Sequence, residues 1–403
     1  MINLNNLLVA VSNALDFVEM DILGITSNHS KRVAYLSFYL AKKLGLSSEE
    51  CFDIVAISIL HDNGISEKML HSNIKGSYQV RQNVLERIEE HCPIGEENIK
   101  DFPFLTDVKN IILYHHERFD GKGFFGIKGD QIPIMAQIIS FVDTIDRLFN
   151  LKENYEEKEK HIVEYVKRQE NKLVSTKILN VFYELIRDKD IMLNLKDELI
   201  DSAVLENIPT FTQELSYMEI RNITKVLSKI IDCKSKFTSY HSIGLATLVS
   251  EMATYYKKGE EEKLKLIIAA DLHDIGKLAI PNNILEKPTK LNDEEYNIIK
   301  THVVYTRKCL ESLSTFKDIT EWASNHHEKL NGLGYPKGLK GSELDFNSRL
   351  LGCLDIYQAL TEDRPYRQPL THNQSMEVLY EMANEKLIDL GITKDIDIVF
   401  GSQ

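Results

Sequence analysis

Apolar side chains recur along most of the chain at the spacing of one face of an α-helix. The pattern is clearest in residues 33–41 (VAYLSFYLA) and 243–249 (IGLATLV), where apolar residues fall at positions i, i+3, i+4 and i+7. Segments that alternate apolar and polar residues, as half-buried strands do, are scarce. The pattern therefore predicts an all-α protein.

Breaks in the helical pattern suggest how the chain is divided. Two loops that contain glycine and proline, residues 120–133 and 331–344, each follow a pair of adjacent histidines. Pro209 interrupts the pattern again, because proline removes a backbone donor. The charged stretch before it keeps helical apolar spacing, which favours closing helices over a disordered linker. We expect two tandem helical-bundle domains, residues 1–205 and 206–403. We also expect each loop to lie at the border of its domain's functional site.

Length and composition agree with this division and narrow the class of protein. The 403 residues allow two domains of about 200 residues, each large enough for its own core. Hydrophobic residues make up 43% and charged residues 27%, as in ordinary globular proteins. No apolar run reaches the ~20 residues of a spanning helix, so we expect a cytoplasmic protein with no membrane partner. The net charge of −13 opposes binding to a nucleic-acid polymer.

Cysteine usage excludes two further classes of site. The five cysteines are Cys51, Cys92, Cys233, Cys309 and Cys353. Because none of them forms a CxxC pair, neither a zinc knuckle nor a disulfide framework is indicated. We expect buried, reduced thiols.

Histidine and aspartate provide the candidate chemistry. Ten of the 13 histidines fall into two sets with the same order and spacing, and each set includes two aspartates. The first set is His29, His61, Asp62, His91, His115, His116 and Asp143. The second set is His241, His273, Asp274, His302, His326, His327 and Asp355. Corresponding members lie 211 or 212 residues apart, which predicts two copies of one site.

Each set is larger than a single metal ion needs. A catalytic zinc takes three protein ligands and water, whereas five histidines and two aspartates suit two divalent metals. The mixture of imidazole and carboxylate is compatible with iron, manganese, cobalt, nickel or zinc. The aspartate of each His-Asp pair could bridge the two ions. Since two ions about 3.5–4 Å apart polarise a phosphoryl group and generate a hydroxide nucleophile, metal-dependent phosphoester hydrolysis is the leading reaction class.

The second half of the chain resembles the HD-GYP domain, a branch of the HD phosphohydrolase superfamily, over residues 237–367. The motifs that carry the resemblance are His241-Ser242, His273-Asp274-Ile275-Gly276-Lys277, Ile280-Pro281, LEKP at 285–288, His302, His326-His327-Glu328, Gly332-Leu333-Gly334-Tyr335-Pro336 and Arg364-Pro365-Tyr366-Arg367. The resemblance implies an all-α protein that hydrolyses cyclic dinucleotides. The expected substrate is cyclic di-GMP, giving pGpG or GMP, although some members act on cyclic GMP-AMP.

The resemblance also implies roles for individual residues. One metal would be held by His241, His273, Asp274 and Asp355, and the other by Asp274, His302, His326 and His327. Asp274 would bridge the ions and, with Lys277, take part in catalysis. Lys277, Tyr335, Arg364 and Arg367 would bind the substrate. Iron is the first expectation for the metal, with manganese or another transition metal as alternatives.

Two positions depart from the family pattern. Phe237 stands where some members carry a glutamate that binds a third metal, which implies two metals here. Gln358 stands where the family has a second aspartate, so we expect a metal ligand to be less firmly oriented.

The first half resembles the same family through its metal ligands and residues 115–121, but its substrate side differs. Ile65 replaces Lys277, Phe124 replaces Tyr335, and the Arg-Pro-Tyr-Arg segment has no counterpart. Asp146 is the counterpart of Gln358 in this half, and it has the carboxylate that Gln358 lacks. We expect this copy to bind metal through the first histidine and aspartate set and to have a regulatory or structural role.

Other functions stay open at this point. The protein could be a non-catalytic cyclic-dinucleotide sensor that binds a partner, or an HD phosphohydrolase acting on another nucleotide. The sequence also leaves open a homodimer or a signalling-protein partner.

Overall fold

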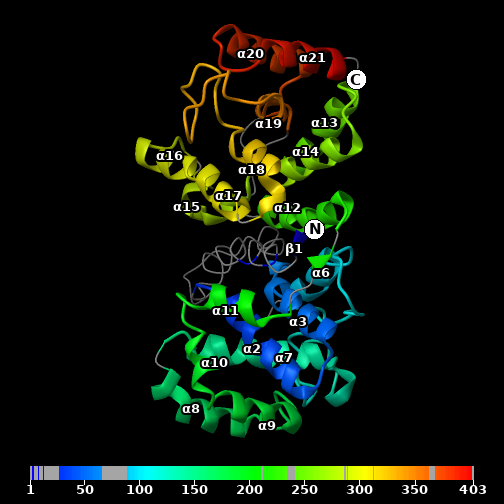
Figure 1. Ribbon diagram of the computed structural model, residues 1–403, viewed down its shortest axis with the longest axis vertical. Coiled ribbons are helices and arrows are strands. Elements are labelled where there is room, and N and C mark those ends of the chain that lie inside the picture. The colour runs from blue at the N-terminus through cyan, green and yellow to red at the C-terminus, as the bar shows by residue number, and fades with distance from the viewer. Residues whose placement is uncertain are drawn as a thin grey trace. The chain divides into compact units, whose positions relative to one another are not determined.

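The computed structural model of the protein is helical (Figure 1). It describes residues 2–3, 8, 12, 27–65, 89–153, 155–209, 212–213, 215–233, 241–285, 287, 289–311, 313–362 and 368–401. Within these residues the prediction of an all-α fold is confirmed. The described part adds one antiparallel pair of two-residue strands, β1 (Ile2–Asn3) and β2 (Thr212–Gln213).

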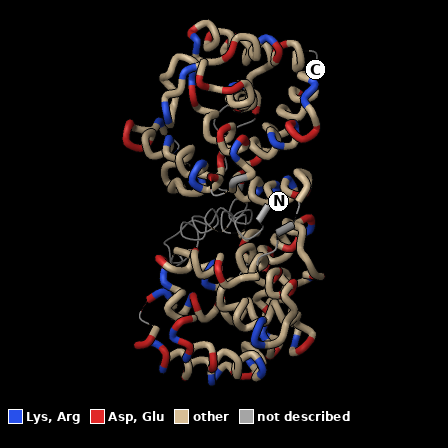
Figure 2. Tube along the Cα trace, viewed as in Figure 1, with Lys and Arg blue, Asp and Glu red and all other residues tan. Residues whose placement is uncertain are grey.

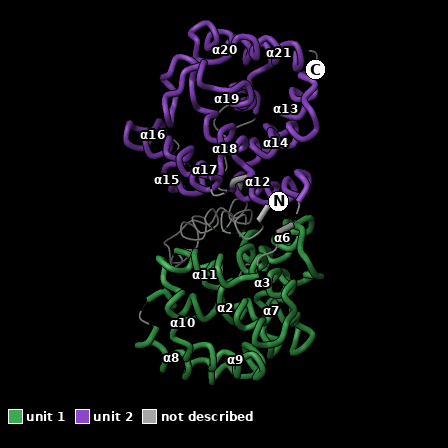
Figure 3. Tube along the Cα trace, viewed as in Figure 1, with its two compact units in different colours: residues 1–213 green, residues 214–403 purple. Residues whose placement is uncertain are grey.

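The chain forms two compact units, Met1–Gln213 and Glu214–Gln403 (Figure 3). Besides the two strands, the N-terminal unit contains α2 (His29–Leu44), α3 (Ser48–Leu60), α6 (His91–Asn98), the 3-10 helix η1 (Gly129–Gln131), α7 (Ile134–Phe149), α8 (Tyr155–Arg168), α9 (Thr176–Leu185), α10 (Lys189–Leu193) and α11 (Ile200–Asn207). None of the described helices in either unit is both long and apolar enough to cross a membrane.

The C-terminal unit has a similar series of helices. It contains α12 (Tyr217–Cys233), α13 (His241–Tyr255), α14 (Glu260–Leu272), η2 (Ile275–Ala279), α15 (Asn282–Leu285), α16 (Asp293–Lys300), α17 (His302–Leu310), η3 (Ser314–Phe316), α18 (Lys317–Ser324), α19 (Phe346–Thr361), α20 (His372–Asn384) and α21 (Leu390–Phe400). In this unit α13 packs against α14 and α19, as α2 packs against α3 and α7 in the N-terminal unit.

Local sequence explains where these helices begin and which face they bury. Ser47 starts α3 with a capping box, because its hydroxyl accepts a bond from the amide of Glu50 while Glu50 accepts one from the amide of Ser47. Helix α8 carries interspersed acidic and basic residues (Figure 2) but buries Ile162 and Val166, which lie one turn apart. The charged stretch before Pro209 is therefore built of packed helices.

Equivalent helix ends deliver the predicted metal ligands. His29 begins α2 and His241 begins α13, while His91 begins α6 and His302 begins α17. The His-Asp pairs directly follow α3 and α14, whose last turns are buried. Asp143 lies on α7 and Asp355 on α19. Each unit thus gathers side chains from five separate segments at one place in its interior.

A glycine holds the turn after each His-Asp pair against the neighbouring helix. A Cβ atom at Gly276 would lie 1.9 Å from the carbonyl oxygen of His302, and one at Gly64 would lie 2.3 Å from that of His91. Both distances are far below van der Waals contact, and the obstructing atoms belong to the backbone. Any larger residue would push the His-Asp pair away from the helix that carries the next histidine.

Gly276→Ala should therefore destabilise the protein by about 3 kcal/mol, the cost of forcing a methyl group into a packed interior. The measurement is urea unfolding of the full chain in metal-free buffer. Gly259→Ala is the matched control, because a Cβ atom there meets no atom within 4 Å. Equal losses of stability in the two variants would contradict the packing argument.

Candidate metal centres

The C-terminal unit brings all seven of its predicted ligands together. Potential ligand atoms lie within 4.8 Å of one another in three overlapping groups, namely His241 with His273 and Asp355, His273 with Asp274 and His326, and His302 with His326 and His327. Asp274 lies at the middle of the set. Its Oδ2 is 3.2 Å from Nε2 of His273, and its Oδ1 is 3.4 Å from Nε2 of His302. The two oxygens thus face different histidines, as a bridging carboxylate requires.

Backbone carbonyl groups orient three of these imidazole rings. Nδ1 of His273 donates a hydrogen bond to the carbonyl oxygen three residues earlier at 2.8 Å, and His302 and His326 make the same bond at 2.7 Å. Because Nδ1 carries the proton, Nε2 presents a lone pair to the centre of the site. The helical backbone that precedes each histidine therefore fixes both the ring and its tautomer.

Unsatisfied buried atoms show that this set fits a metal ion. Within the described part of the chain, Nε2 of His273, Nε2 of His302 and Oδ1 of Asp274 are buried and have no hydrogen-bond partner. Leaving such an atom unpaired costs about 1–3 kcal/mol, and more for a charged group. Imidazole nitrogens and carboxylate oxygens are ligands of divalent transition metals. Bound cations would satisfy all three atoms at once.

Protonation states in the C-terminal unit suit the same purpose. Burial lowers the pKa of His302 to about 4 and that of His327 to about 3, which keeps both rings neutral. Burial alone would raise the pKa of Asp274, but the neighbouring His273 and Lys277 hold it well below its usual range. These residues are thus in the forms that bind metals, whereas Asp355 and Glu362 outweigh burial and raise the pKa of His241 to about 9, so a metal ion bound by His241 would have to displace a proton.

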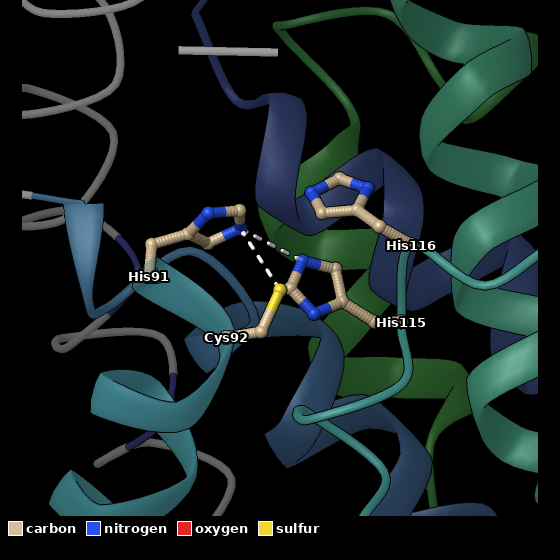
Figure 4. Close-up of side chains that lie close together, drawn as sticks. All are labelled: His91, Cys92, His115 and His116. Carbon is tan, nitrogen blue, oxygen red and sulfur yellow. Dashed lines mark hydrogen bonds between the residues drawn. The ribbon is translucent and has the colours of Figure 1, made fainter. Parts of the chain in front are cut away.

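The N-terminal unit brings its seven predicted ligands together in a similar way. His29, His61 and Asp143 form one group, and His91, His115 and His116 belong to another. Asp62 lies between the groups, with Oδ2 3.4 Å from His61 and Oδ1 3.6 Å from His115. The second group also includes the buried thiol of Cys92, which no sequence pattern had placed there (Figure 4).

A salt bridge supports the first histidine of the N-terminal unit. Asp146 accepts a hydrogen bond from Nδ1 of His29 at 2.6 Å and two more from the guanidinium of Arg32, each at 2.9 Å. Burial lowers the pKa of His29, but Asp143 and Asp146 outweigh it and raise the value to about 10. The hydrogen bond from Nδ1 to Asp146 orients the ring, and a metal ion bound at Nε2 would displace the second proton that the raised pKa implies.

The C-terminal unit supports its first histidine differently. Gly244 takes the place of Arg32 and leaves room for Gln358, whose Nε2 would lie 2.6 Å from a Cβ atom at Gly244. The carboxylate facing Nδ1 of His241 comes instead from Glu362, at 3.4 Å. Sequence analysis missed Glu362, although its position four residues after Gln358, one helical turn later, was a usable signal. Glu362 thus supplies a carboxylate near His241, where the family pattern would supply one from an aspartate at position 358.

The two centres differ most on the side where a substrate would enter. In the C-terminal unit Lys277 donates a hydrogen bond to Asp274, and the ring of Tyr335 packs on His327 with centroids 4.8 Å apart. In the N-terminal unit Ile65 is buried and Phe124 has no hydroxyl group. Arg364 and Arg367, predicted to bind substrate, lie outside the described residues, as does Phe237.

A buried glutamate shapes the loop that carries Tyr335. The carboxylate of Glu328 accepts hydrogen bonds from the backbone amides of Lys337 and Leu339, at 2.7 and 2.9 Å. Glu117 makes the equivalent pair of bonds in the N-terminal unit, at 2.6 and 2.7 Å. The glutamate after each histidine pair thus folds the following loop back against the metal ligands.

Comparisons with known proteins identify relatives of the whole chain. The HD domain family matches residues 18–171 and 225–392. The chain is 31% identical over 387 residues to the 3'3'-cGAMP-specific phosphodiesterase 1 of Vibrio cholerae, covering 94% of this chain and 87% of the relative. It is also 31% identical over 211 residues to a probable cyclic di-GMP phosphodiesterase of the same organism, covering 48% of this chain and 46% of the relative.

A solved structure shares the fold. A crystal structure of a cyclic GMP-AMP specific phosphodiesterase of V. cholerae aligns with a TM-score of 0.67 at 23% identity, covering 100% of this chain and 98% of the other. That likeness agrees with an HD-type helical bundle.

Glu362→Gln should weaken metal binding at the C-terminal centre by about 10–100-fold, because residues that orient a ligand contribute on that scale. Affinity is measured by competition with a chromophoric chelator, in a chain whose N-terminal centre is disabled by His61→Ala and His115→Ala. The control is Glu377→Gln, an exposed position on α20. Unchanged affinity in Glu362→Gln would show that His241 needs no such support.

Proposed function

The chain belongs to the HD domain family, in its HD-GYP branch, and from this we propose that its C-terminal unit is a metal-dependent phosphodiesterase for a cyclic dinucleotide. The observation that carries the proposal is the placement of Lys277 and Tyr335 beside buried metal ligands in that unit. The corresponding residues of the N-terminal unit are apolar. We also propose the functional division at residues 1–205 and 206–403.

The proposed metal ligands are those that the C-terminal unit gathers. His241, His273, Asp274 and Asp355 would hold one ion, and Asp274, His302, His326 and His327 would hold the other. When bound, two divalent ions polarise a phosphodiester and lower the pKa of water. We propose iron as the physiological metal, with manganese or another transition metal as the alternative.

The other residues of the site would bind and orient the substrate. The side chain of Lys277 is 21% exposed and its ammonium touches Asp274, so it can reach a phosphate placed over the ligands and neutralise its charge. The ring of Tyr335 offers a flat face and a hydroxyl next to His327. Arg364 and Arg367 would hold the second phosphate or a base. Hydrolysis of one phosphodiester would add one water and open the ring to a linear dinucleotide, and a second hydrolysis would give mononucleotides.

We propose 3'3'-cGAMP as the substrate, ahead of the cyclic di-GMP that motif resemblance alone favoured. Two relatives that align over 94% of this chain are named for 3'3'-cGAMP, whereas a relative named for cyclic di-GMP aligns over 48%. We propose a regulatory or structural role for the N-terminal unit, because its metal-ligand set lacks a neighbouring lysine at the position of Ile65.

Metal-loaded full-length protein should hydrolyse 3'3'-cGAMP faster than cyclic di-GMP, and both faster than deoxynucleoside triphosphates or guanosine tetraphosphate. Products are measured by chromatography under anaerobic, reducing conditions. Removing the metals with a chelator should abolish turnover, and adding iron or manganese should restore it. Binding of cyclic dinucleotides without any turnover would favour the sensor alternative, and preferential turnover of nucleoside phosphates would favour a general HD phosphohydrolase.

Lys277→Ile, which copies Ile65 of the N-terminal unit, should lower kcat/KM by about 100-fold, as expected for loss of one group that stabilises transition-state charge. Metal content should stay unchanged, because Lys277 supplies no ligand. Lys394→Ile, at an exposed position on α21, is the control. Wild-type kcat/KM in Lys277→Ile would remove this residue from the mechanism.

A further inference from the structure

Cys92 occupies a place in the N-terminal centre that has no equivalent in the C-terminal one. Its Sγ lies 3.6 Å from Nε2 of His91, which in turn lies 3.4 Å from Nε2 of His115 (Figure 4). Together with His116, the four potential ligand atoms all lie within 4.8 Å of one another. The side chain of Cys92 is fully buried.

We propose that His91, Cys92, His115 and His116 form a tetrahedral zinc site with one thiolate and three imidazole ligands. Zinc binds sulfur at about 2.3 Å and imidazole nitrogen at about 2.0–2.1 Å. In a regular tetrahedron these bond lengths separate sulfur from nitrogen by about 3.6 Å and nitrogen from nitrogen by about 3.3 Å. The observed separations of 3.6 and 3.4 Å match both values.

The thiol changes which metal the site selects. Thiolate is a soft ligand that favours zinc, whereas sites built from imidazole and carboxylate accept iron or manganese more readily. In the C-terminal unit the residue after His302 is Val303, which is buried and cannot bind a metal. The two units would therefore differ in metal preference at this position.

The thiol also changes what the metal can do. A zinc ion with four protein ligands is typical of structural sites, whereas a catalytic zinc keeps a position for water or substrate. With Cys92 as the fourth ligand, Asp62 would bind the other metal through Oδ2, together with His29, His61 and Asp143. Its Oδ1, 3.6 Å from Nε2 of His115 and 3.7 Å from Nε2 of His91, would then lie beside the zinc ligands without binding the zinc. The N-terminal centre would then be closed at one metal, a barrier to catalysis independent of the missing lysine. This inference does not depend on the proposed function of the C-terminal unit.

Cobalt substitution tests the proposal directly. The full chain is stripped of metal under reducing conditions and reconstituted with Co²⁺, because thiolate bound to Co²⁺ gives a charge-transfer band in the near ultraviolet that imidazole and carboxylate do not. The wild-type protein should show this band. Cys92→Val, which copies Val303, and Cys92→Ser should lose it, whereas Cys51→Val, at a buried cysteine on α3, should keep it.

Zinc content gives a second readout. After dialysis against a chelator of moderate strength, the wild-type chain should retain one more zinc ion than Cys92→Val. Wild-type cobalt protein without the band would overturn the proposal, even if the variants fail to fold. A band that survives in a folded Cys92→Val variant would also overturn it. Neither result depends on turnover, so failure here is distinguishable from failure of the proposed phosphodiesterase.

Discussion

Each unit is organised around a buried aspartate that the protein alone leaves unsatisfied. Among the described residues, both oxygens of Asp62 and one oxygen of Asp274 are buried and without a hydrogen-bond partner. Burying an ionised carboxylate costs several kcal/mol unless a compensating charge lies close by. The surrounding imidazoles present lone pairs, because Nδ1 of rings such as His273 is already bonded to the backbone. Metal binding and stability should therefore be coupled in both units.

The features around that aspartate separate into those the units share and those that distinguish them. Both units use a glycine to pack the His-Asp turn on the next ligand helix, and both use a glutamate to fold the following loop. They differ at single positions that change chemistry without changing the frame. Lys277 of the C-terminal unit corresponds to Ile65 of the N-terminal unit, and Val303 corresponds to Cys92. A common scaffold would in this way support both the proposed hydrolytic centre of the C-terminal unit and the proposed four-ligand zinc site of the N-terminal unit.

The sequence was sufficient for features that depend on residue type or on a regular spacing of residues. Helical periodicity predicted the all-α fold, and the motifs around His273 predicted the family, which the match to the HD domain confirms. The repeated spacing of histidines and aspartates identified the side chains that the structure gathers, although their roles as ligands stay predictions.

Cys92 and Glu362 were missed for a physical reason. Cys92 has no counterpart in the second set, where Val303 follows His302, so the repeated pattern gave no signal for it. Glu362 lies one helical turn after Gln358, which was a usable signal, but packing creates its contact with His241, more than a hundred residues away in the sequence.

The central claim, that hydrolysis belongs to the C-terminal centre and the N-terminal centre has another role, is tested most directly by a matched pair of substitutions. Turnover of 3'3'-cGAMP is measured for full-length His273→Ala and His61→Ala, each reconstituted with the same metal and checked for folding. The account predicts loss of turnover by more than about 1,000-fold for His273→Ala, because the metal centre that lowers the barrier is dismantled. It predicts that His61→Ala keeps most of its turnover. Equal losses in the two variants would contradict it.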